Sequence, residues 1–171
     1  MINKIYIEYL LLKDDNESFQ QVLSIIHPKL LSFAQGIVKD KSKSQDAVQE
    51  SMMAITKGYS KLKDYRKFHL WIYQVTRNKC LDMIRKNHKY KNDCDLTSLE
   101  EMRAQKNDVD LQLDMMYLIK QLPHKQKNVI QLFYYDGFNI REIADILKTP
   151  EGSIKSLLFD ARENLRQQIG E

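Results

Sequence analysis

The scarcity of turn-forming residues is the feature that most constrains the fold of this chain. Its 171 residues include only five Gly and three Pro, with one Asp-Gly pair at Asp136-Gly137 and no Asn-Gly pair. Such pairs are the strongest short-range signal for a β-hairpin. Apolar residues instead recur three and four positions apart, as at Phe19, Val22 and Ile26, which is the spacing of a helix face. We therefore predict an all-α protein.

The first half of the chain is expected to contain four helices joined by short polar connections. The predicted elements are, in order, a short helix over 5–12, a helix capped by Asp15 or Asn16, a polar loop over 39–44, a helix with apolar residues from Val48 to Leu62, a connection over 63–67, and a helix that carries Trp71. Pro28 falls inside the second helix, which either kinks there or restarts with Pro28 in its first turn.

A basic and aromatic stretch, residues 57–91, is the first candidate functional surface. It holds eleven Lys or Arg and two Asp, a balance of +9, whereas the whole chain carries +4. The only Trp, Trp71, lies within it among five Tyr and Phe residues. Cations mixed with aromatic rings indicate a surface for phosphates and unpaired bases. The alternative is a helix with an apolar stripe and a solvated basic face. Trp71 has helical spacing with Phe68, Ile72 and Val75, which favours core packing of its ring over base stacking.

An acidic segment separates this basic stretch from the end of the chain. Between Asn92 and Asp114 the chain holds seven acidic and two basic residues. Helical spacing of apolar residues resumes only at Leu111 and continues through Met115 and Leu118. We therefore interpret residues 92–110 as an acidic linker between two small helical domains, which span 1–91 and 111–171.

The C-terminal part has the organisation of a helix-turn-helix motif. A helix over 125–135 is expected to end at Asp136-Gly137, where Gly can adopt positive φ. Asn139 and Glu142 have the form of a capping box, which predicts a short helix over 140–147. A turn and a longer helix then complete the motif.

The last helix of this motif is the second candidate functional surface. Thr149 is its expected cap and Pro150 its first residue, and its apolar residues from Ile154 to Ile169 are expected to face inward. Small residues between 152 and 156 suit a helix that enters the major groove of DNA. Lys155 and Arg162 can reach phosphates or guanine edges. The alternative is a three-helix bundle whose last helix is simply basic.

The residues give no support for a metal, a cofactor or a catalytic centre. Cys80 and Cys94 form no CxxC pair and the four His are scattered, so we expect no metal site and no cofactor. Asp136, Glu142 and Asp145 fit caps and surface charges better than catalytic acids. No apolar run approaches the roughly 20 residues of a membrane span. We therefore predict a non-enzymatic protein of the reducing cytoplasm, without membrane insertion.

Three motifs in a fixed order resemble those of the extracytoplasmic-function (ECF) group of bacterial RNA polymerase sigma factors. That group's polymerase-binding helix resembles DAVQESMMAITKGYSKL, its promoter −10 helix resembles FHLWIYQVTRNKCLDMIRK, and its −35 domain resembles LPHKQKNVIQLFYYDGFNIREIADILKTPEGSIKSLLFDARENLRQ. The likeness extends over residues 17–169. It implies a dissociable specificity subunit that recognises the −10 and −35 promoter elements and promotes transcription initiation.

The resemblance also implies partners and three sets of site residues. For polymerase binding these are Asp46, Val48, Gln49 and Glu50; for the −10 element, Tyr65, Arg66, Lys67, Trp71, Gln74, Arg77, Asn78 and Arg85; for the −35 element, Arg141, Ser153, Lys155, Ser156 and Arg162. The implied partners are core RNA polymerase, promoter DNA and an anti-sigma factor. The acidic linker is expected to lie in a basic channel used by RNA.

Three other interpretations compete with this one. A free-standing helix-turn-helix transcriptional regulator accounts for residues 111–171 but leaves the Trp71 region unexplained. An enzyme that acts on nucleic acid lacks a candidate catalytic cluster in this sequence. An anti-sigma factor or adaptor does not need a basic helix that enters a DNA groove.

Overall fold

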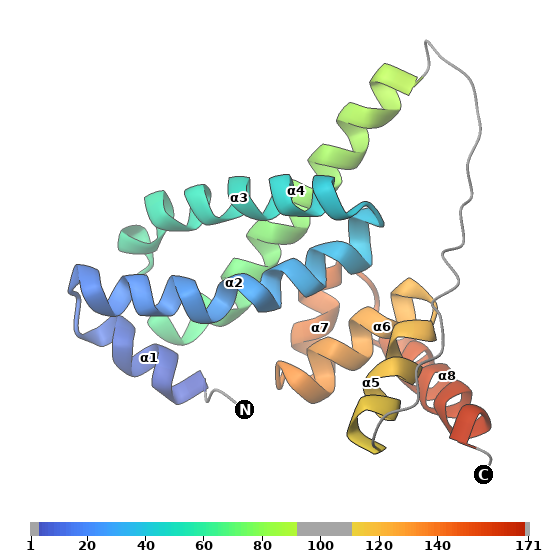
Figure 1. Cartoon of the computed structure of the whole chain (residues 1–171). Coiled ribbons are helices and arrows are strands. Elements are labelled where there is room, and N and C mark those ends of the chain that lie inside the picture. Colours follow the sequence, from blue (N-terminus) through green and yellow to red (C-terminus); the bar gives the residue numbers. More distant parts are fainter. Residues whose placement is uncertain (1–3, 92–110, 170–171) are drawn as a thin grey trace.

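The computed structural model describes residues 4–91 and 111–169 (Figure 1). Within those ranges every element of regular secondary structure is helical, which confirms the predicted all-α class. The predicted linker over 92–110 lies outside the described residues. None of the described helices is both long enough and apolar enough to cross a bilayer.

The first half consists of four helices, α1 (Lys4–Leu12), α2 (Asn16–Val38), α3 (Lys41–Gly58) and α4 (Phe68–Lys91), with two single 3-10 turns over 59–61 and 65–67. As predicted, Asp15 caps α2, and its carboxylate accepts a hydrogen bond of 2.7 Å from the backbone N–H of Ser18. The helix continues through Pro28, which excludes the restart, one of the two alternatives that the sequence left open. Pro28 lies on the exposed side of α2, where water can satisfy the carbonyl that loses its intrahelical partner.

The predicted loop over 39–44 is also wrong, because only two of its residues lie outside a helix. Lys39 ends α2 in the left-handed conformation, with φ at 62°. Asp40 then caps α3, and its carboxylate accepts a 3.0 Å hydrogen bond from the backbone N–H of Lys43. One left-handed residue followed by one capping residue is enough to reverse the chain. As a result, α3 starts earlier than its apolar residues indicate.

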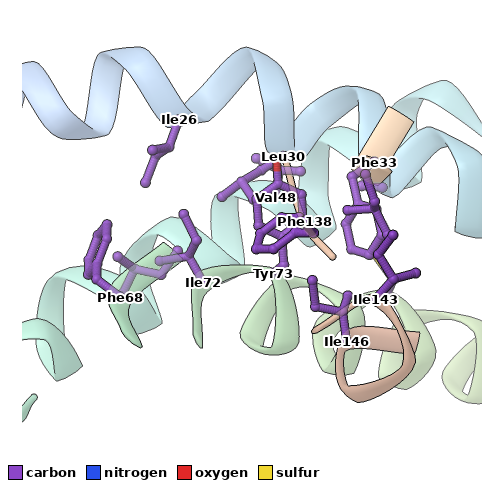
Figure 2. Packing of buried hydrophobic residues seen from close by; sticks show 14 of the residues in the cluster. Ile26, Leu30, Phe33, Val48, Phe68, Ile72, Tyr73, Phe138, Ile143 and Ile146 are labelled. Carbon is purple, nitrogen blue, oxygen red and sulfur yellow. The ribbon is translucent and has the colours of Figure 1, made fainter. Parts of the chain in front are cut away.

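Helices α2, α3 and α4 enclose the core of the first half (Figure 2). Three large side chains of α4 are fully buried there: Phe68, Ile72 and Tyr73. Three small side chains of α3 are fully buried against them: Ser44, Ala47 and Ser51. Each of the two serine hydroxyls donates a 2.6 Å hydrogen bond to a backbone carbonyl one turn earlier in its own helix. These hydroxyls therefore need no partner on a neighbouring helix, and the three helices can pack closely.

The second half consists of α5 (Leu111–Gln121), α6 (His124–Ile130), α7 (Ile140–Leu147) and α8 (Glu151–Ile169). A π-helical turn over 131–135 extends α6. The predicted stop is confirmed, since Gly137 has φ of 74°. The predicted capping box is also confirmed, with both hydrogen bonds between Asn139 and Glu142 at 2.9 Å. Helices α7 and α8 pack together through Ile143, Ile154 and neighbouring apolar residues, as a helix-turn-helix requires.

Two details of the second half differ from the predictions. Helix α8 begins at Glu151 rather than Pro150, and the hydroxyl of Thr149 donates to the carbonyl of Leu147 instead of capping α8. Ile169, which was expected to face inward, is 52% exposed, and Met115 of the apolar series in α5 is 39% exposed. The outer ends of α5 and α8 extend past their neighbours and leave these two apolar side chains beside an open groove.

The two halves pack against each other, although the linker separates them in sequence. Helix α6 contacts α2, and α7 contacts α4 (Figure 1). Phe138, which precedes α7, reaches into the core of the first half and is 3% exposed (Figure 2). The described residues therefore form one continuous helical body.

Candidate nucleic-acid interface

An acidic and polar face of α3 is the first candidate surface. Asp46 and Gln49 are exposed on it, and Glu50 is half-exposed with its carboxylate 3.3 Å from the ammonium of Lys79 on α4. Val48, predicted to belong to this surface, is instead fully buried against α2 and α4. Val48 belongs to the motif because its side chain packs in the core and so fixes the position of α3, from which Asp46, Gln49 and Glu50 project. The sequence did not single out Met53, which is 55% exposed and extends the same face by one turn.

The basic surface lies at the start of α4 and along its outer side. Arg66 and Lys67 are exposed before α4, where Asp64 holds the Arg66 guanidinium at 3.0 Å and thereby raises the pKa of that arginine. Tyr65 beside them is half-buried. Further along, Gln74 is half-buried, and Asn78 is exposed.

Two arginines of α4 differ in their surroundings. Arg85 is exposed, with its guanidinium 3.3 Å from the carboxylate of Asp82. Arg77 is half-buried and faces the second half of the molecule. Burial, and then the nearby charge of Arg85, lowers the pKa of the Arg77 guanidinium. The structure therefore separates Arg77 from the freely exposed basic side chains.

Trp71 is half-buried at the junction of α3 and α4. Its environment therefore lies between a fully packed core position and a fully exposed base-stacking position. Its ring centroid is 6.0 Å from that of Phe68, in the core. Its outer edge lies against Gly58, where an added Cβ would be 2.9 Å from the Trp71 ring. Gly58 thus leaves room for this edge of the ring at the end of α3. Part of the indole remains accessible from outside.

The exposed face of α8 carries most of the predicted −35 residues. Ser153, Lys155 and Ser156 are exposed on it, and Arg141 is exposed on α7. Phe159 was not predicted, yet it is 65% exposed and lies one turn beyond Lys155 and Ser156 on the same face. Its ring therefore forms part of the accessible surface of α8. Sequence alone did not reveal it, because Leu157 and Leu158 beside it obscure the helical pattern.

Arg162 lies three residues beyond Phe159 on the same side of α8. Its Nε donates a 2.9 Å hydrogen bond to the hydroxyl of Tyr134, and its guanidinium lies over the rings of Phe133 and Tyr134. It lines an open apolar groove of about 430 Å³ together with Met115 and other residues of α5 and α8. The assignment of Arg162 as a −35 contact stays a prediction; in this structure its guanidinium is directed toward Tyr134.

A second groove, of about 960 Å³, lies between the two halves. Arg77 and Leu81 of α4 line one side, and Ser153, Ser156 and Asp160 of α8 line the other. The structure therefore brings one predicted −10 residue and two predicted −35 residues to the same groove.

Among the described residues no cluster of His, Cys, Asp and Glu has the arrangement of a metal site.

Both halves match models of known families. The model described as sigma-70 region 2 matches residues 24–90, and the model described as sigma-70, region 4 matches residues 118–167. Together they cover more than half of the chain and include α3, α4, α7 and α8. The chain belongs to the sigma-70 family of RNA polymerase sigma factors, in its ECF group.

Relatives of this sigma factor align over most of its length. The ECF RNA polymerase sigma factor SigW of Bacillus subtilis is 26% identical over 171 residues, which cover 92% of this chain and 91% of SigW. SigM of the same organism is 28% identical over 157 residues, which cover 88% of this chain and 92% of SigM. The interpretation as a sigma factor made from the three motifs is confirmed.

Two solved structures share the arrangement of helices. RpoE of Bartonella quintana, solved in complex with the anti-sigma factor NepR, has a TM-score of 0.63 and 25% identity, and the match covers 90% of this chain and 97% of RpoE. CnrH, solved with the cytosolic domain of CnrY, has a TM-score of 0.57 and covers 97% of this chain and 96% of CnrH. At 16% identity the likeness to CnrH concerns the fold alone.

Proposed function

We propose that this sigma factor divides promoter recognition among three helices: α3 binds core RNA polymerase, α4 captures the −10 element and α8 reads the −35 element. The observation that carries this proposal is the burial pattern of α3. Asp46 and Gln49 are exposed on either side of the fully buried Val48. A polar face backed by a packed core is rigid, and a rigid face loses little conformational entropy when it binds.

The proposed −10 surface comprises Arg66, Lys67, Asn78 and Arg85, with the accessible edge of Trp71 beside them. Unstacking a base costs a few kcal/mol, and stacking it on an aromatic ring returns about 1–3 kcal/mol. No single contact therefore keeps a strand open. Phosphate contacts from several cations and binding of the polymerase have to act together with the ring.

The proposed −35 surface is the exposed face of α8 around Lys155 and Ser156, with Arg141 of α7 at its border. A helix that enters the major groove reads base edges with its N-terminal residues, while the preceding helix crosses the backbone. Arg141 is positioned for a phosphate on this proposal. Arg162 lies at the far end of this surface, where its Nε donates a hydrogen bond to the hydroxyl of Tyr134.

The proposal extends to the partners and the setting. The domains are proposed as 1–91 and 111–171, joined by a linker over 92–110 that occupies a basic RNA channel of the polymerase. An anti-sigma factor is a proposed partner, because RpoE was solved with one. The protein is proposed to act in the cytoplasm, where transcription takes place, and to have no catalytic activity of its own.

Run-off transcription with purified core polymerase and a promoter library tests the function directly.

Asp46→Ala with Gln49→Ala is expected to reduce polymerase binding at least tenfold (about 1.4 kcal/mol) without changing the melting temperature. The matched control is Glu17→Ala with Gln20→Ala, an exposed acid and amide at the same spacing on α2. Equal affinity of the two double variants would contradict the assignment of α3.

A free-standing regulator is the alternative function, and the same preparation distinguishes it. Stable, sequence-specific binding of promoter DNA by the chain alone, unaltered by core polymerase, would favour the regulator. The proposal expects specific initiation only when both proteins are present.

A further inference from the structure

The groove of about 960 Å³ between the halves has the size of a ligand site. Its volume is at the upper end of the range for such sites, about 300–1,000 Å³. The end of α2 and the middle of α4 form one wall, and the start of α6 and the N-terminal half of α8 form the other. Gly36 and Asn128 meet where these walls join, since a Cβ added at Gly36 would lie 2.6 Å from the Cγ atom of Asn128. Any ligand of this groove therefore contacts both halves.

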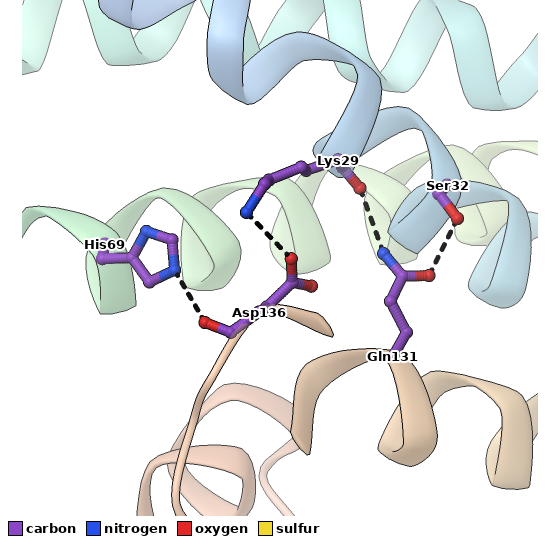
Figure 3. Close-up of polar contacts among 5 residues, drawn as sticks. All are labelled: Lys29, Ser32, His69, Gln131 and Asp136. Atoms are coloured by element: carbon purple, nitrogen blue, oxygen red, sulfur yellow. Dashed lines mark hydrogen bonds and ion pairs between the residues drawn. The ribbon is translucent and has the colours of Figure 1, made fainter. Parts of the chain in front are cut away.

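Polar contacts between the halves hold the walls of the groove in place (Figure 3). The ammonium of Lys29 on α2 lies 3.4 Å from the carboxylate of Asp136, whose side chain is 2% exposed. Gln131 donates a 3.3 Å hydrogen bond to the carbonyl of Lys29 and accepts one of 2.8 Å from the hydroxyl of Ser32. The Nε2 atom of His69 lies 3.4 Å from the carbonyl oxygen of Asp136. The groove is therefore preformed, which lowers the entropy that a ligand has to offset on binding.

The groove between the halves carries an excess of positive charge. Among the described residues, Lys39, Arg77 and Lys125 line it together with a single carboxylate, Asp160. In the described parts of the chain, none of these three cations lies within ion-pair distance of a carboxylate. Burial, and then the charge of Lys39, lowers the pKa of His124, which also lines the groove. The charges of both halves therefore act on the same space and favour an anion there.

Arg77 differs from the other two cations because it is half-buried. No side chain or carbonyl of the described residues pairs with its guanidinium, whereas the exposed Arg85 has Asp82 at 3.3 Å. Charges that are withdrawn from water normally have partners, because their desolvation is otherwise uncompensated. An anion bound in the groove would supply the missing partner of Arg77.

The rest of the lining suits an organic group rather than a bare ion. Leu81 of α4, Leu147 of α7 and Leu157 of α8 contribute apolar surface. Ser153 and Ser156 of α8 contribute hydroxyls, which can pair with the hydroxyls of a sugar. A nucleotide combines a flat base, a hydroxylated sugar and phosphates, and so matches all three parts of the lining.

We propose that the groove between the halves binds a nucleoside triphosphate, whose phosphates pair with its three cations and whose base packs against its three leucines. The same groove includes Arg77 of the proposed −10 surface and Ser153 and Ser156 of the proposed −35 surface. A bound nucleotide therefore competes with promoter DNA for these side chains. The competition rests on the proposed function, but binding of the nucleotide by the free chain does not.

Calorimetric titration of the free full chain with ATP at physiological ionic strength tests the site. Adenosine and inorganic tripolyphosphate serve as the two separate parts of the ligand. We expect ATP to bind at least about tenfold more tightly than either part, because only ATP fills both the cationic and the apolar side. Tripolyphosphate that binds as tightly as ATP would overturn the inference, since the groove would then accept any polyanion. Absence of binding at millimolar ATP would overturn it as well.

Two pairs of variants show whether ATP lies in this groove. Arg77→Ala is expected to weaken ATP binding at least about tenfold, while Arg166→Ala, which removes an exposed arginine of α8 outside the groove, should not. Asp160→Asn removes the carboxylate of the lining and should tighten binding about twofold to threefold. Its control is Asp145→Asn, an exposed acid of α7 outside the groove. Equal effects within each pair would indicate general attraction by the surface charge and contradict the site.

Competition with DNA separates this inference from the proposed function. At ten times its Kd, ATP should raise the apparent Kd of wild type for a −35 duplex about elevenfold in fluorescence anisotropy. Tight, Arg77-dependent binding of ATP with an unchanged duplex Kd would support the site and contradict the proposed −35 surface. A single-stranded oligonucleotide that binds through Arg77, and that ATP does not displace, would assign the groove to nucleic acid and overturn the inference.

Discussion

Burial gives adjacent residues of one motif different roles in this sigma factor. Val48 and Gln49 are neighbours in sequence, yet Val48 is fully buried and Gln49 is exposed. Arg77 and Asn78 differ in the same way, since Arg77 lines the groove between the halves while Asn78 faces solvent. A motif match therefore identifies a segment, and burial decides which of its side chains a partner can touch.

Phe159 is expected to read a thymine in the −35 element. Its exposed ring lies on the face of α8 that carries Lys155 and Ser156, and the 5-methyl group of thymine is the apolar feature of the major groove. Replacing each thymine of the −35 duplex in turn by deoxyuracil, which lacks that methyl, should weaken binding at one position. The expected loss is about 0.8 kcal/mol, or roughly fourfold in Kd.

Phe159→Ala should be insensitive to that replacement. Ile169→Ala removes another exposed apolar side chain of α8 and should respond to it as the wild type does. Equal affinity of the wild type for all of the substituted duplexes would show that Phe159 reads no thymine methyl.

Trp71→Ala is expected to lower the free energy of unfolding by about 2–3 kcal/mol, less than the roughly 3–5 kcal/mol of a fully buried aromatic ring. The reason is that Trp71, which packs on Phe68 and Gly58, is only half-buried. Urea denaturation measures the loss, with Phe68→Ala as the fully buried reference. A loss below about 1 kcal/mol together with impaired promoter opening would assign the ring mainly to DNA.

At the scale of the element, short polar caps position the helices that carry the proposed sites. Asp40 starts α3 two residues after α2 ends, and the Asn139–Glu142 capping box starts α7 two residues after Gly137. Each cap satisfies backbone N–H groups that would otherwise lack partners. The direction of α3 and α7, and hence of the faces they present, depends on these few residues.

Asn139→Ala is expected to destabilise the second half by about 1 kcal/mol, because α7 loses the side-chain acceptor for its Glu142 N–H. Thermal unfolding of the full chain checks this, and binding to a −35 duplex should weaken in parallel. Asn16→Ala serves as the control, since Asp15 supplies the cap of α2. Equal melting temperatures of the two variants would refute the role of the box.

Sequence reasoning found these elements because caps and helical spacing are local. Asp15, Asn139 with Glu142, and Gly137 were identified correctly from residues a few positions apart. The contact between the halves was not predicted. Gln131 bonds to residues 99 and 102 positions away, and nothing in its own segment distinguishes it from a surface glutamine.

The candidate site residues show the same limit. Helical position identified the exposed polar face of α3, but it did not predict that Val48 is buried or that Tyr134 holds Arg162. Asp136 was interpreted as a cap or surface charge, although its side chain is buried between the two halves. Such assignments require the tertiary structure, because the partner that decides them is distant in sequence.

At the scale of the whole molecule, the contact between the two halves buries the Asp136 carboxylate. Lys29 of α2, His69 and Tyr73 of α4, and Gln131 of α6's π-helical extension surround the segment of Asp136. Burial raises the pKa of the Asp136 carboxyl, and the Tyr73 hydroxyl and the Lys29 ammonium oppose that shift only in part. Burial, and then the charge of Asp136, raises the pKa of Tyr73 as well.

Acid is therefore expected to favour the docked arrangement of the two halves. A carboxyl whose pKa is raised by docking takes up a proton when the halves dock, so docking is strongest below its ordinary pKa near 4 and weakens as pH rises through the raised value. Scattering between about pH 4.5 and 7.5 measures this, over the range in which the chain stays folded. Asp136→Asn should remove most of the slope, and an identical slope in both proteins would contradict the assignment to Asp136.

The interface between the halves can form only after both of its sides have been synthesised. Its first side, on α2 and α4, leaves the ribosome before Gln131, Asp136 and Phe138 have been joined to the chain. Those residues follow some 60 positions later, a delay of about 3–12 s at 5–20 residues per second. During that interval the nascent first half presents α3 and its basic helix with nothing docked on them. Newly made chains therefore pass through an uncovered state before the second half can fold and close over the first.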